Sequence, residues 1–407
     1  MLYFTNQELA TANHVSVRTV RNWIEAARSG KLDLILHNKG ERTYIANTSK
    51  NLVVIKRLAE SGKKYRPHRS QRTVSPKSEF YDLYTQEQLF DIVSNMEINH
   101  EIPRQYNYFG DGAENWDNYA NRLAIEDTPN LLHATLELLD NNKEYLDHLL
   151  EQYEQVNVID IGVGNAMPVR GFLSHLLEQN KLGRYLAIDI SPTMLDIAEK
   201  NINKWFGDKV DYEGYALDID HDRFGNLLAE EYIKSDSKGT TNIVLFLGGT
   251  IANFKKPGTI LQVIHDSMGV NDFMIHHQTL DTQFGRHYFD FNSGTSGSSL
   301  APNHRYIFDL LNIDESLYEV EMGFDTEQSE RYIRVALKIA LAIRFKFEGG
   351  ERIISFNKGD TILLWRHRHN NLIDILTLLT NNEFSPLQVS QAFDQQSLLT
   401  ISRITHD

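Results

Sequence analysis

The chain has 407 residues, 41% of them hydrophobic, which is enough for two or three domains with cores of their own. It has no cysteine, so disulfides, thiolate metal sites and a cysteine nucleophile are excluded. The net charge of -14 is unevenly divided: residues 1–78 carry 15 Lys and Arg against 5 Asp and Glu, and residues 79–407 carry 26 against 50. The acidic surface expected for residues 79–407 would repel the phosphates of a nucleic acid and would attract a cationic ligand.

The N-terminus, MLYFTNQELATAN, lacks the basic and apolar regions of a signal peptide. Nowhere does the chain have an uninterrupted apolar run of about 18 residues, the length that predicts a membrane span. We therefore expect no contact with a membrane and a cytoplasmic location.

Residues 5–28 predict two short helices around a turn at Asn13 and His14. Thr5 and Ser16 stand where N-caps are expected, because their side-chain oxygens can accept from the first free N–H groups of each helix. The start of the chain is therefore predicted to be a small helical module.

The second helix carries Arg18, Arg21 and Asn22 on the face opposite its apolar side chains. A hairpin at residues 34–45 and a third helix at residues 49–62 follow. This order resembles the winged helix-turn-helix of the MerR or excisionase type, which implies that the three polar side chains meet phosphates and base edges of DNA. Such units also serve as docking or dimerisation modules, so DNA binding through the basic first 78 residues, protein docking and a homodimer all stay open.

Composition predicts four segments. The helix-turn-helix module covers residues 1–62, and residues 63–78 form a basic linker that is too polar to build a core. Residues 79–150 have apolar positions at helical spacing and are expected to form a helical region around the pocket. Residues 151–407 are predicted to form the main domain.

The run VIDIGVGNAMP, Val158 to Pro168, predicts a buried strand that ends in a glycine-rich turn. Gly162 and Gly164 allow a tight turn and a close approach of the backbone to a ligand, and the next helix aims its free N–H groups there. Met167 replaces the third glycine of a dinucleotide motif, so the pattern points away from NAD.

Three more candidate strands follow, and each ends in a polar or glycine residue. The second ends at Asp189, the third at Asp218, and the fourth runs from Asn242 to Gly248 and Asn253. Open α/β sheets bind ligands at the carboxyl ends of their strands. Four such ends in order predict a ligand site at this edge.

This order of motifs resembles that of the class I S-adenosylmethionine-dependent methyltransferases. The resemblance implies a Rossmann-like α/β sheet with S-adenosylmethionine as cofactor, Asp189 on the ribose and Asp218 beside the adenine. The implied cofactor-binding residues are Asp160, Gly162, Gly164, Asp189, Asp218 and Gly248.

The fourth strand narrows the resemblance. FLGGTIANF is similar to the FLGSTIGN-type signature of the histidine-specific Nα-methyltransferase family, which trimethylates histidine on the way to ergothioneine; this implies that Asn253 holds the substrate amino acid. Residues 106–113 resemble the family's Y-x-Y-D-x-x-G-S segment and residues 118–122 its YYPTR segment. Tyr108 and Tyr119 are thereby implied to be catalytic-site tyrosines. The resemblance runs from about residue 100 to the C-terminus.

The chain departs from this family at the residues that bind the imidazole ring of histidine. A gapless alignment of GGERIISFNKGD places Phe356 and Lys358 at the family's glutamate and serine. We therefore expect the residues that bind the imidazole ring of histidine in this family to be absent here. Asp111 or Glu114 could supply an acidic group in their place, and the identity of the substrate stays open.

The last third of the chain predicts the antiparallel edge of the sheet. Residues 329–357 form an alternating strand, a turn at Gly349 and Gly350, and a return strand, followed by a helix and a final strand, SLLTISRI. The histidines of HDSMGVNDFMIHHQ and RHRHN lack metal-ligand spacing with carboxylates; we interpret these segments as a strand edge and a solvated turn and expect no metal.

The prediction is an S-adenosylmethionine-dependent N-methyltransferase that acts on an amino acid or related small amine, with an accessory DNA-binding-like module. The alternative is a transcription regulator that uses the methyltransferase fold as a sensor. A DNA methyltransferase ranks last, because the fourth strand lacks the Pro-Pro-aromatic motif of enzymes that methylate a flipped base.

Overall fold

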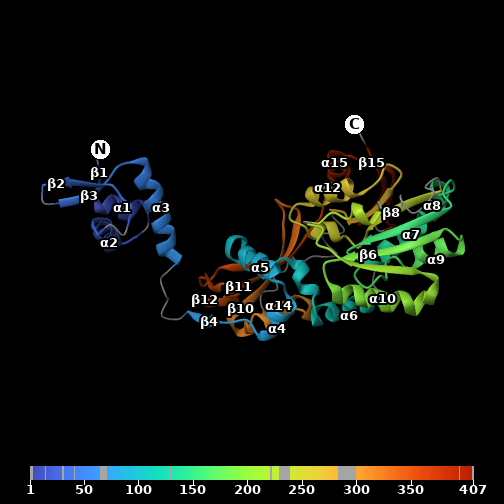
Figure 1. The fold of residues 1–407 in the computed structure, drawn as a ribbon, viewed down its shortest axis with the longest axis horizontal. Helices are drawn as coiled ribbons and strands as arrows, with labels where there is room; N and C mark the ends of the chain where they lie inside the picture. Colours follow the sequence, from blue (N-terminus) through green and yellow to red (C-terminus); the bar gives the residue numbers. More distant parts are fainter. Residues whose placement is uncertain are drawn as a thin grey trace. The chain divides into compact units, whose positions relative to one another are not determined.

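The computed structural model describes residues 3–13, 15–29, 32–40, 42–64, 71–127, 130–220, 222–228, 239–282, 299–393 and 395–405. The chain divides into two compact units, Met1–Gln71 and Arg72–Asp407 (Figure 1). None of the described helices is both long enough and apolar enough to cross a membrane.

The first unit contains the predicted helices and hairpin. Thr5 and Ser16 cap the first two helices by accepting hydrogen bonds from Glu8 N and Thr19 N, as the sequence predicts. Its small core includes Val20, Trp23 and Ile24. The elements are β1 (Tyr3–Phe4), α1 (Asn6–Ala12), α2 (Val17–Arg28), β2 (Leu36–Lys39), β3 (Arg42–Ala46) and α3 (Ser49–Lys64), with the strand order β1-β3-β2.

The second unit is built on a seven-stranded mixed sheet with the order β15-β16-β9-β8-β5-β6-β7. Only β16 runs antiparallel to its neighbours; the other described pairings in this sheet are parallel. The predicted Rossmann-like sheet is therefore present. Its strands are β5 (Gln155–Ile161), β6 (Leu182–Asp189), β7 (Asp211–Ala216), β8 (Thr240–Phe246), β9 (Phe273–Thr279), β15 (Phe384–Gln391) and β16 (Ser397–Ile404).

Helices cover both faces of this sheet because its strands are apolar on both sides. Val156 and Val158 of β5 pack into one core, and Ile159 and Ile161 pack into the other. In Figure 1, α12 lies on one side of the sheet and α10 on the other. The first layer contains α7 (Leu131–Asn141), α8 (Lys143–Leu149), α9 (Arg170–Glu178) and α10 (Pro192–Phe206). The second layer contains α12 (Pro257–Ser267) and α15 (Leu372–Asn381). Two short helices are η2 (Gly207–Lys209), which follows α10, and η3 (Thr250–Asn253), which precedes α12.

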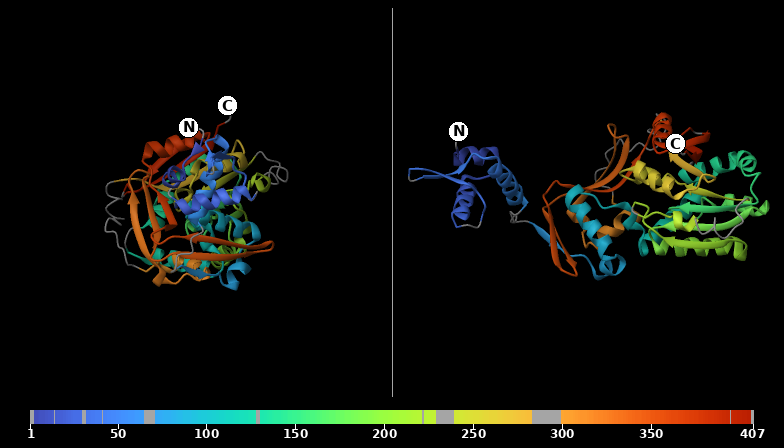
Figure 2. Two further views of the ribbon diagram at one scale, coloured as in Figure 1. Left: turned by 90° about the vertical axis from the view of Figure 1, so that its left-hand side faces the viewer. Right: turned by 45° about the horizontal axis from the view of Figure 1, so that its top comes forward.

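A third core joins segments from both ends of this unit. Residues 74–109 and 300–364 share one hydrophobic cluster, and Figure 2 shows the orange strands beside the cyan helices. The elements are β4 (Arg72–Val74), α4 (Ser78–Leu83), α5 (Gln86–Asn99), η1 (Arg104–Tyr108), α6 (Asp111–Ile125), α14 (Pro302–Leu310), η4 (Glu315–Leu317), β10 (Tyr318–Asp325), β11 (Glu330–Leu337), β12 (Leu341–Phe347), β13 (Gly350–Phe356) and β14 (Thr361–Arg368).

This packing differs from the predicted segment boundaries in two places. Residues 63–78 were expected to form a linker, but α3 extends to Lys64 and β4 pairs in parallel with β12. Strands β10 to β14 form two separate three-stranded sheets, β10-β11-β14 and β13-β12-β4, and add nothing to the seven-stranded sheet.

The predicted antiparallel edge is confirmed for its final strand, SLLTISRI, which is β16, and is wrong for the hairpin that precedes it. The hairpin at Gly349 and Gly350 exists, but its strands β12 and β13 belong to a three-stranded sheet. The antiparallel strand is β16, and it lies one position inside the edge because β15 pairs outside it. Strand β15 was missed because Pro386 and its polar residues Ser385, Gln388, Ser390 and Gln391 interrupt the apolar pattern, as is typical of an edge strand or a loop.

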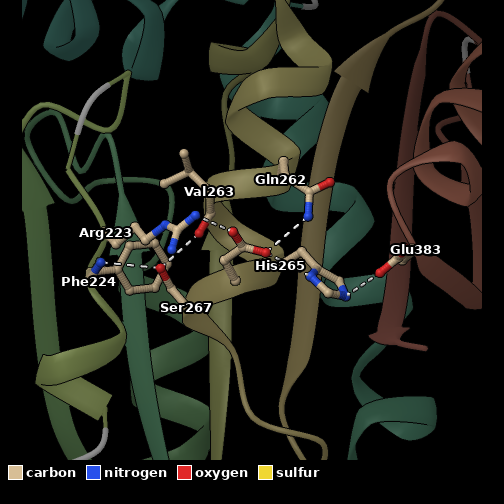
Figure 3. Close-up of polar contacts among 8 residues, drawn as sticks. Arg223, Phe224, Gln262, Val263, His265, Ser267 and Glu383 are labelled. Carbon is tan, nitrogen blue, oxygen red and sulfur yellow. Dashed lines mark hydrogen bonds and ion pairs between the residues drawn. The ribbon is translucent and has the colours of Figure 1, made fainter. Parts of the chain in front are cut away.

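Polar side chains tie the end of α12 to two other segments (Figure 3). Asp266 pairs with Arg223 at 2.6 Å, and the two imidazole nitrogens of His265 lie 3.3 Å from Asp266 and 3.3 Å from Glu383. This cluster precedes β9, so it lies at the amino ends of the strands, opposite the edge where parallel sheets bind ligands.

Candidate functional site

One cavity of about 840 Å³ opens at the carboxyl ends of β5, β6 and β8. This volume lies within the range of pockets that bind small molecules. The cavity brings together every residue predicted for cofactor or substrate binding: Tyr108, Tyr119, Asp160, Gly162, Gly164, Asp189, Asp218, Gly248 and Asn253.

The glycine loop after β5 forms one wall. Gly162 and Gly164 have φ values of 67° and 54°, which favour glycine. A Cβ atom on Gly162 would lie 3.2 Å from the Thr250 side chain, and one on Gly164 would lie 3.5 Å from Trp116. The backbone is therefore exposed to a ligand where side chains would fill the space.

Two buried carboxylates stand at the ends of neighbouring strands. Desolvation raises the pKa of Asp160 to about 7, against the effect of the Tyr185 hydroxyl, which donates to it at 2.8 Å. Desolvation also raises the pKa of Asp189 to about 6, although backbone N–H groups, among them that of Ser191 at 3.0 Å, favour its charged form. Both groups can accept hydrogen bonds from hydroxyl or ammonium donors of a ligand.

Arg104 enters the cavity from the opposite wall. Its guanidinium lies over the rings of Tyr108, Trp116 and Trp365 at 5.7, 5.4 and 5.5 Å. It donates hydrogen bonds to the Tyr108 hydroxyl and, at 3.4 Å, to Oδ1 of Asn253. Aromatic rings and neutral oxygens therefore fix the position of this cation.

The contacts of Asn253 determine which of its amide atoms is available. Arg104 only donates, so the atom it faces is the amide oxygen, and His367 Nδ1 lies 3.3 Å from the same oxygen. His367 Nε2 lies 2.7 Å from Thr279 Oγ1, and burial lowers the pKa of His367 well below its usual value. The neutral imidazole thus donates from Nδ1 and accepts at Nε2, so Arg104 and His367 both donate to the Asn253 oxygen.

Successive side chains of a strand point to opposite faces of the sheet, so the charged side chains of β11 and β14 are divided between the two faces of their sheet. Arg366 pairs with Glu101 at 2.6 Å and with Glu330 at 3.2 Å on the face away from the cavity. Arg331 and His367, which are cross-strand partners, line the cavity on the other face. The acidic groups of these strands therefore do not line the site.

Two predictions about the residues that would bind an imidazole ring are corrected. Phe356 is buried in the third core and Lys358 is exposed, so neither lines the cavity. Asp111 and Glu114, the alternative acidic groups, are exposed at the start of α6 and do not line it either. Strands β11 and β14 reach the site, whereas β13 pairs with β12 in another sheet.

The two histidine segments are also corrected. His276 and His277 lie on β9, which is inside the sheet between β8 and β16, and desolvation lowers their pKa values to about 4 and 3. His367 and His369 are buried and line the cavity, so RHRHN is no solvated turn. Among the described residues no group of three or more His, Asp or Glu is placed to hold a metal ion.

The sequence reasoning missed the cavity residues Arg104, His304, Arg331, Trp365 and His367. The alternation of Trp365 and His367 along β14 was the available signal, since side chains two apart share a face. Arg104 and His304 gave none, because they come from segments that meet only in the folded chain.

Comparison with protein-family models finds a match over part of the chain. The model described as "Histidine-specific methyltransferase, SAM-dependent" matches residues 90–283, a little less than half of the chain. A search of curated proteins found no match to this sequence.

Among solved structures, the chain is similar to an S-adenosylmethionine-dependent methyltransferase from Clostridium acetobutylicum (TM-score 0.41, 9% identity, 72% of this chain and 99% of that chain). It is also similar to the CcbJ methyltransferase from Streptomyces caelestis (TM-score 0.41, 10% identity, 73% and 100%). A third is the magnesium protoporphyrin IX methyltransferase from Synechocystis (TM-score 0.40, 10% identity, 74% and 98%).

The glycine loop, the two buried carboxylates and Asn253 all lie within the residues that the family model matches. Exposed backbone beside carboxylates at adjacent strand ends fits a cofactor that carries a ribose and an ammonium group. The chain is an S-adenosylmethionine-dependent methyltransferase.

Proposed function

We propose that this enzyme methylates the amino group of an amino acid or a related small amine. The observation that carries the proposal is the Asn253 amide in the cavity wall, whose oxygen accepts from two protein donors; we propose that its NH₂ group binds the substrate. Tyr108 and Tyr119 line the same side and are proposed to close over the substrate. S-adenosylmethionine, when bound, supplies an electrophilic methyl group.

The proposed cofactor contacts follow from the strand ends. Asp189 accepts hydrogen bonds from the ribose hydroxyls, Asp218 lies beside the adenine, and the backbone at Gly162, Gly164 and Gly248 borders the cofactor. Asp160 completes this wall. Positioning carries most of the catalysis, since displacement at a sulfonium methyl needs little acid-base assistance once the nucleophile has a lone pair.

The amine must bind without its extra proton. Burial lowers the pKa of His304 to about 3, with a further contribution from Arg104, and burial also holds the pKa of His367 well below its usual value. Neither imidazole takes up a proton near pH 7, so we assign no general base. The Arg104 charge instead favours the neutral form of an amine bound beside it.

A transfer assay tests the proposal. The purified enzyme is incubated with methyl-labelled S-adenosylmethionine and a panel of amino acids and small amines, and products are identified by mass. We expect N-methylated product from at least one member. An enzyme that binds S-adenosylhomocysteine but methylates only oxygen or sulfur acceptors, or none, contradicts the proposal.

Cofactor affinity is expected to depend on pH. An ionised Asp189 accepts charge-assisted hydrogen bonds from ligand hydroxyls, whereas a protonated Asp189 makes only weaker, neutral hydrogen bonds. Its raised pKa of about 6 means that it is protonated in the free protein below that pH. The affinity for S-adenosylhomocysteine should then fall about tenfold for each pH unit below 6 and change little above pH 7. Calorimetry from pH 5 to 8 measures this, and Asp189→Asn should flatten the part of the slope that this group causes.

We infer that the first unit is a winged helix-turn-helix that binds DNA. Its exposed α2 side chains Arg18, Arg21 and Asn22 support this, as does the excess of 15 basic over 5 acidic residues in positions 1–78. A homodimer would present two such helices to two half-sites.

Salt-dependent binding of the full chain to duplex DNA tests the role of the arginines. The double variant Arg18→Ala with Arg21→Ala should bind more weakly and lower the slope of log affinity against log salt by about 0.9 for each lost phosphate contact. Arg28→Ala is the control, because Arg28 ends the same helix but pairs with Glu25 at 2.8 Å. Equal binding by the double variant and its parent would contradict this role.

A further inference from the structure

Asp160, near the carboxyl end of β5, is held by a single side chain. The Tyr185 hydroxyl donates to its Oδ2 atom at 2.8 Å, and the two residues are buried, with exposed fractions of 4% for Asp160 and 0% for Tyr185. Within the part of the chain that the structure describes, no other donor forms a hydrogen bond with this carboxylate. Asp189 differs, because backbone N–H groups of three residues favour its charged form. The charged form of Asp160 therefore depends on one hydroxyl group, which a substitution can remove.

The register of β5 and β6 places Tyr185 next to Asp160. Tyr185 lies opposite Val158, and Asp160 lies opposite Ala187, two residues further along both strands. Because side chains two apart in a strand share a face, Tyr185 and Asp160 are diagonal neighbours on the face that carries Val158. A tyrosine ring is long enough to span this diagonal, so its hydroxyl reaches the carboxylate from the side of the apolar core.

Burial keeps the hydroxyl of this pair protonated and destabilises the charged carboxylate. Burial raises the pKa of Tyr185 well above its ordinary value, so its hydroxyl donates throughout the neutral range. Burial raises the pKa of Asp160 to about 7, and the hydrogen bond from Tyr185 opposes this rise. The other titratable groups that act on this pair are Asp189, which raises the pKa of Asp160 further, and Tyr212 of β7, which burial keeps neutral by raising its own pKa. On the side of β8 the strand partner of Asp160 is the apolar Leu245.

We propose that Tyr185 is a positioning residue for the cofactor: its hydroxyl holds Oδ2 of the ionised Asp160 carboxylate and leaves Oδ1 to accept from the ligand. This inference rests on the proposed contact of Asp160 with the cofactor, and it adds a residue that does not line the cavity. The cofactor carries an ammonium group, and an ionised carboxylate binds such a group more strongly than a protonated carboxyl does. Tyr185 thus acts on cofactor affinity through Asp160 without touching the cofactor.

The affinity for S-adenosylhomocysteine, measured by calorimetry between pH 7 and 9, tests this inference. Tyr185→Phe removes a donor that favours the charged carboxylate, so the ionisation of Asp160 should move about 1 to 1.5 pH units higher. We expect the variant to bind about 5 to 15-fold more weakly than the parent at pH 7 and within about twofold of it at pH 9. The ammonium group of the ligand titrates identically in every experiment, so the ratio of the two affinities isolates the effect of the substitution.

Tyr212→Phe is the matched control. The Tyr212 hydroxyl donates to the carbonyl oxygen of Leu195 at 2.8 Å, and its ring lies 5.8 Å from that of Tyr185. This variant should bind S-adenosylhomocysteine as the parent does at each pH. In an Asp160→Asn background, Tyr185→Phe should cause no pH-dependent change in affinity. If Tyr185→Phe loses the same affinity at every pH, or loses none, the inference is overturned, because the hydroxyl then has only a structural role or no role.

Two further measurements keep the test decisive. If Tyr185→Phe fails to fold, 3-fluorotyrosine at position 185 keeps the ring and makes its hydroxyl a stronger donor, so the affinity at pH 6.5 should rise; an unchanged affinity overturns the inference. If Asp160→Asn binds S-adenosylhomocysteine as the parent does at every pH, the proposed contact of Asp160 fails and the inference fails with it. Neither result bears on amine methylation, because cofactor binding is measured without an acceptor.

Discussion

Replacing Asp189 by Asn is expected to weaken the binding of S-adenosylhomocysteine by about 10 to 100-fold. A hydrogen bond to an ionised carboxylate contributes roughly 1.5–3 kcal/mol, and Asn offers a neutral oxygen and a donor in its place. The side chain lies at the end of β6, where the N–H groups of Ser191, Gly164 and Ile190 hold the carboxylate toward the cavity. Calorimetric titration of both proteins measures the change.

The control is Asp211→Asn, which removes an exposed carboxylate at the other end of the neighbouring strand β7. It should bind S-adenosylhomocysteine as the parent does. Equal affinity of Asp189→Asn and the parent would show that the ribose contact is made elsewhere. A loss of the folded state, seen as a lower melting temperature without ligand, would require Asp189→Glu as a second variant that keeps the charge.

The parallel part of the sheet was predictable because each of its strands can be recognised from a short segment of the sequence. Buried parallel strands are continuous apolar runs, and each of β5, β6 and β8 ends in a residue that alters the pattern, such as Asp189 or Gly248. The segment from Ser329 to Asn357 misled because alternation shows that a strand exists and not which strand it pairs with. Its two halves join separate sheets.

The cofactor side of the cavity was predictable for the same reason, since its residues follow strand ends that one parallel sheet brings to a common edge. The acceptor side was predictable only in part. The family resemblance indicated Tyr108, Tyr119 and Asn253, but the residues of α14, β11 and β14 that complete this side are distant in sequence and gave no shared motif. His367 illustrates this: its role depends on its contacts with Asn253 and Thr279 across other elements. Only the third core, which packs residues 74–109 with residues 300–364, brings these segments together.

Replacing Asn253 by Ala is expected to raise the KM for the methyl acceptor about 10 to 100-fold and to change the affinity for S-adenosylhomocysteine less than about twofold. The substitution removes the NH₂ donor presented to the acceptor and leaves Gly162, Gly164 and Asp189 in place. His367 and Arg104 would each lose an acceptor, so a part of the effect reflects their release. Steady-state kinetics with the best acceptor and calorimetry with the cofactor product separate the two affinities.

Two further variants decide whether Asn253 acts on the acceptor directly. Asn99→Ala removes an exposed amide from α5 and should leave KM and kcat unchanged. His367→Gln keeps a neutral side chain that can hydrogen-bond to the Asn253 oxygen, so it should raise KM less than Asn253→Ala does. If Asn253→Ala instead lost cofactor binding while its KM for the acceptor stayed the same, the loop after β8 would belong to the cofactor site.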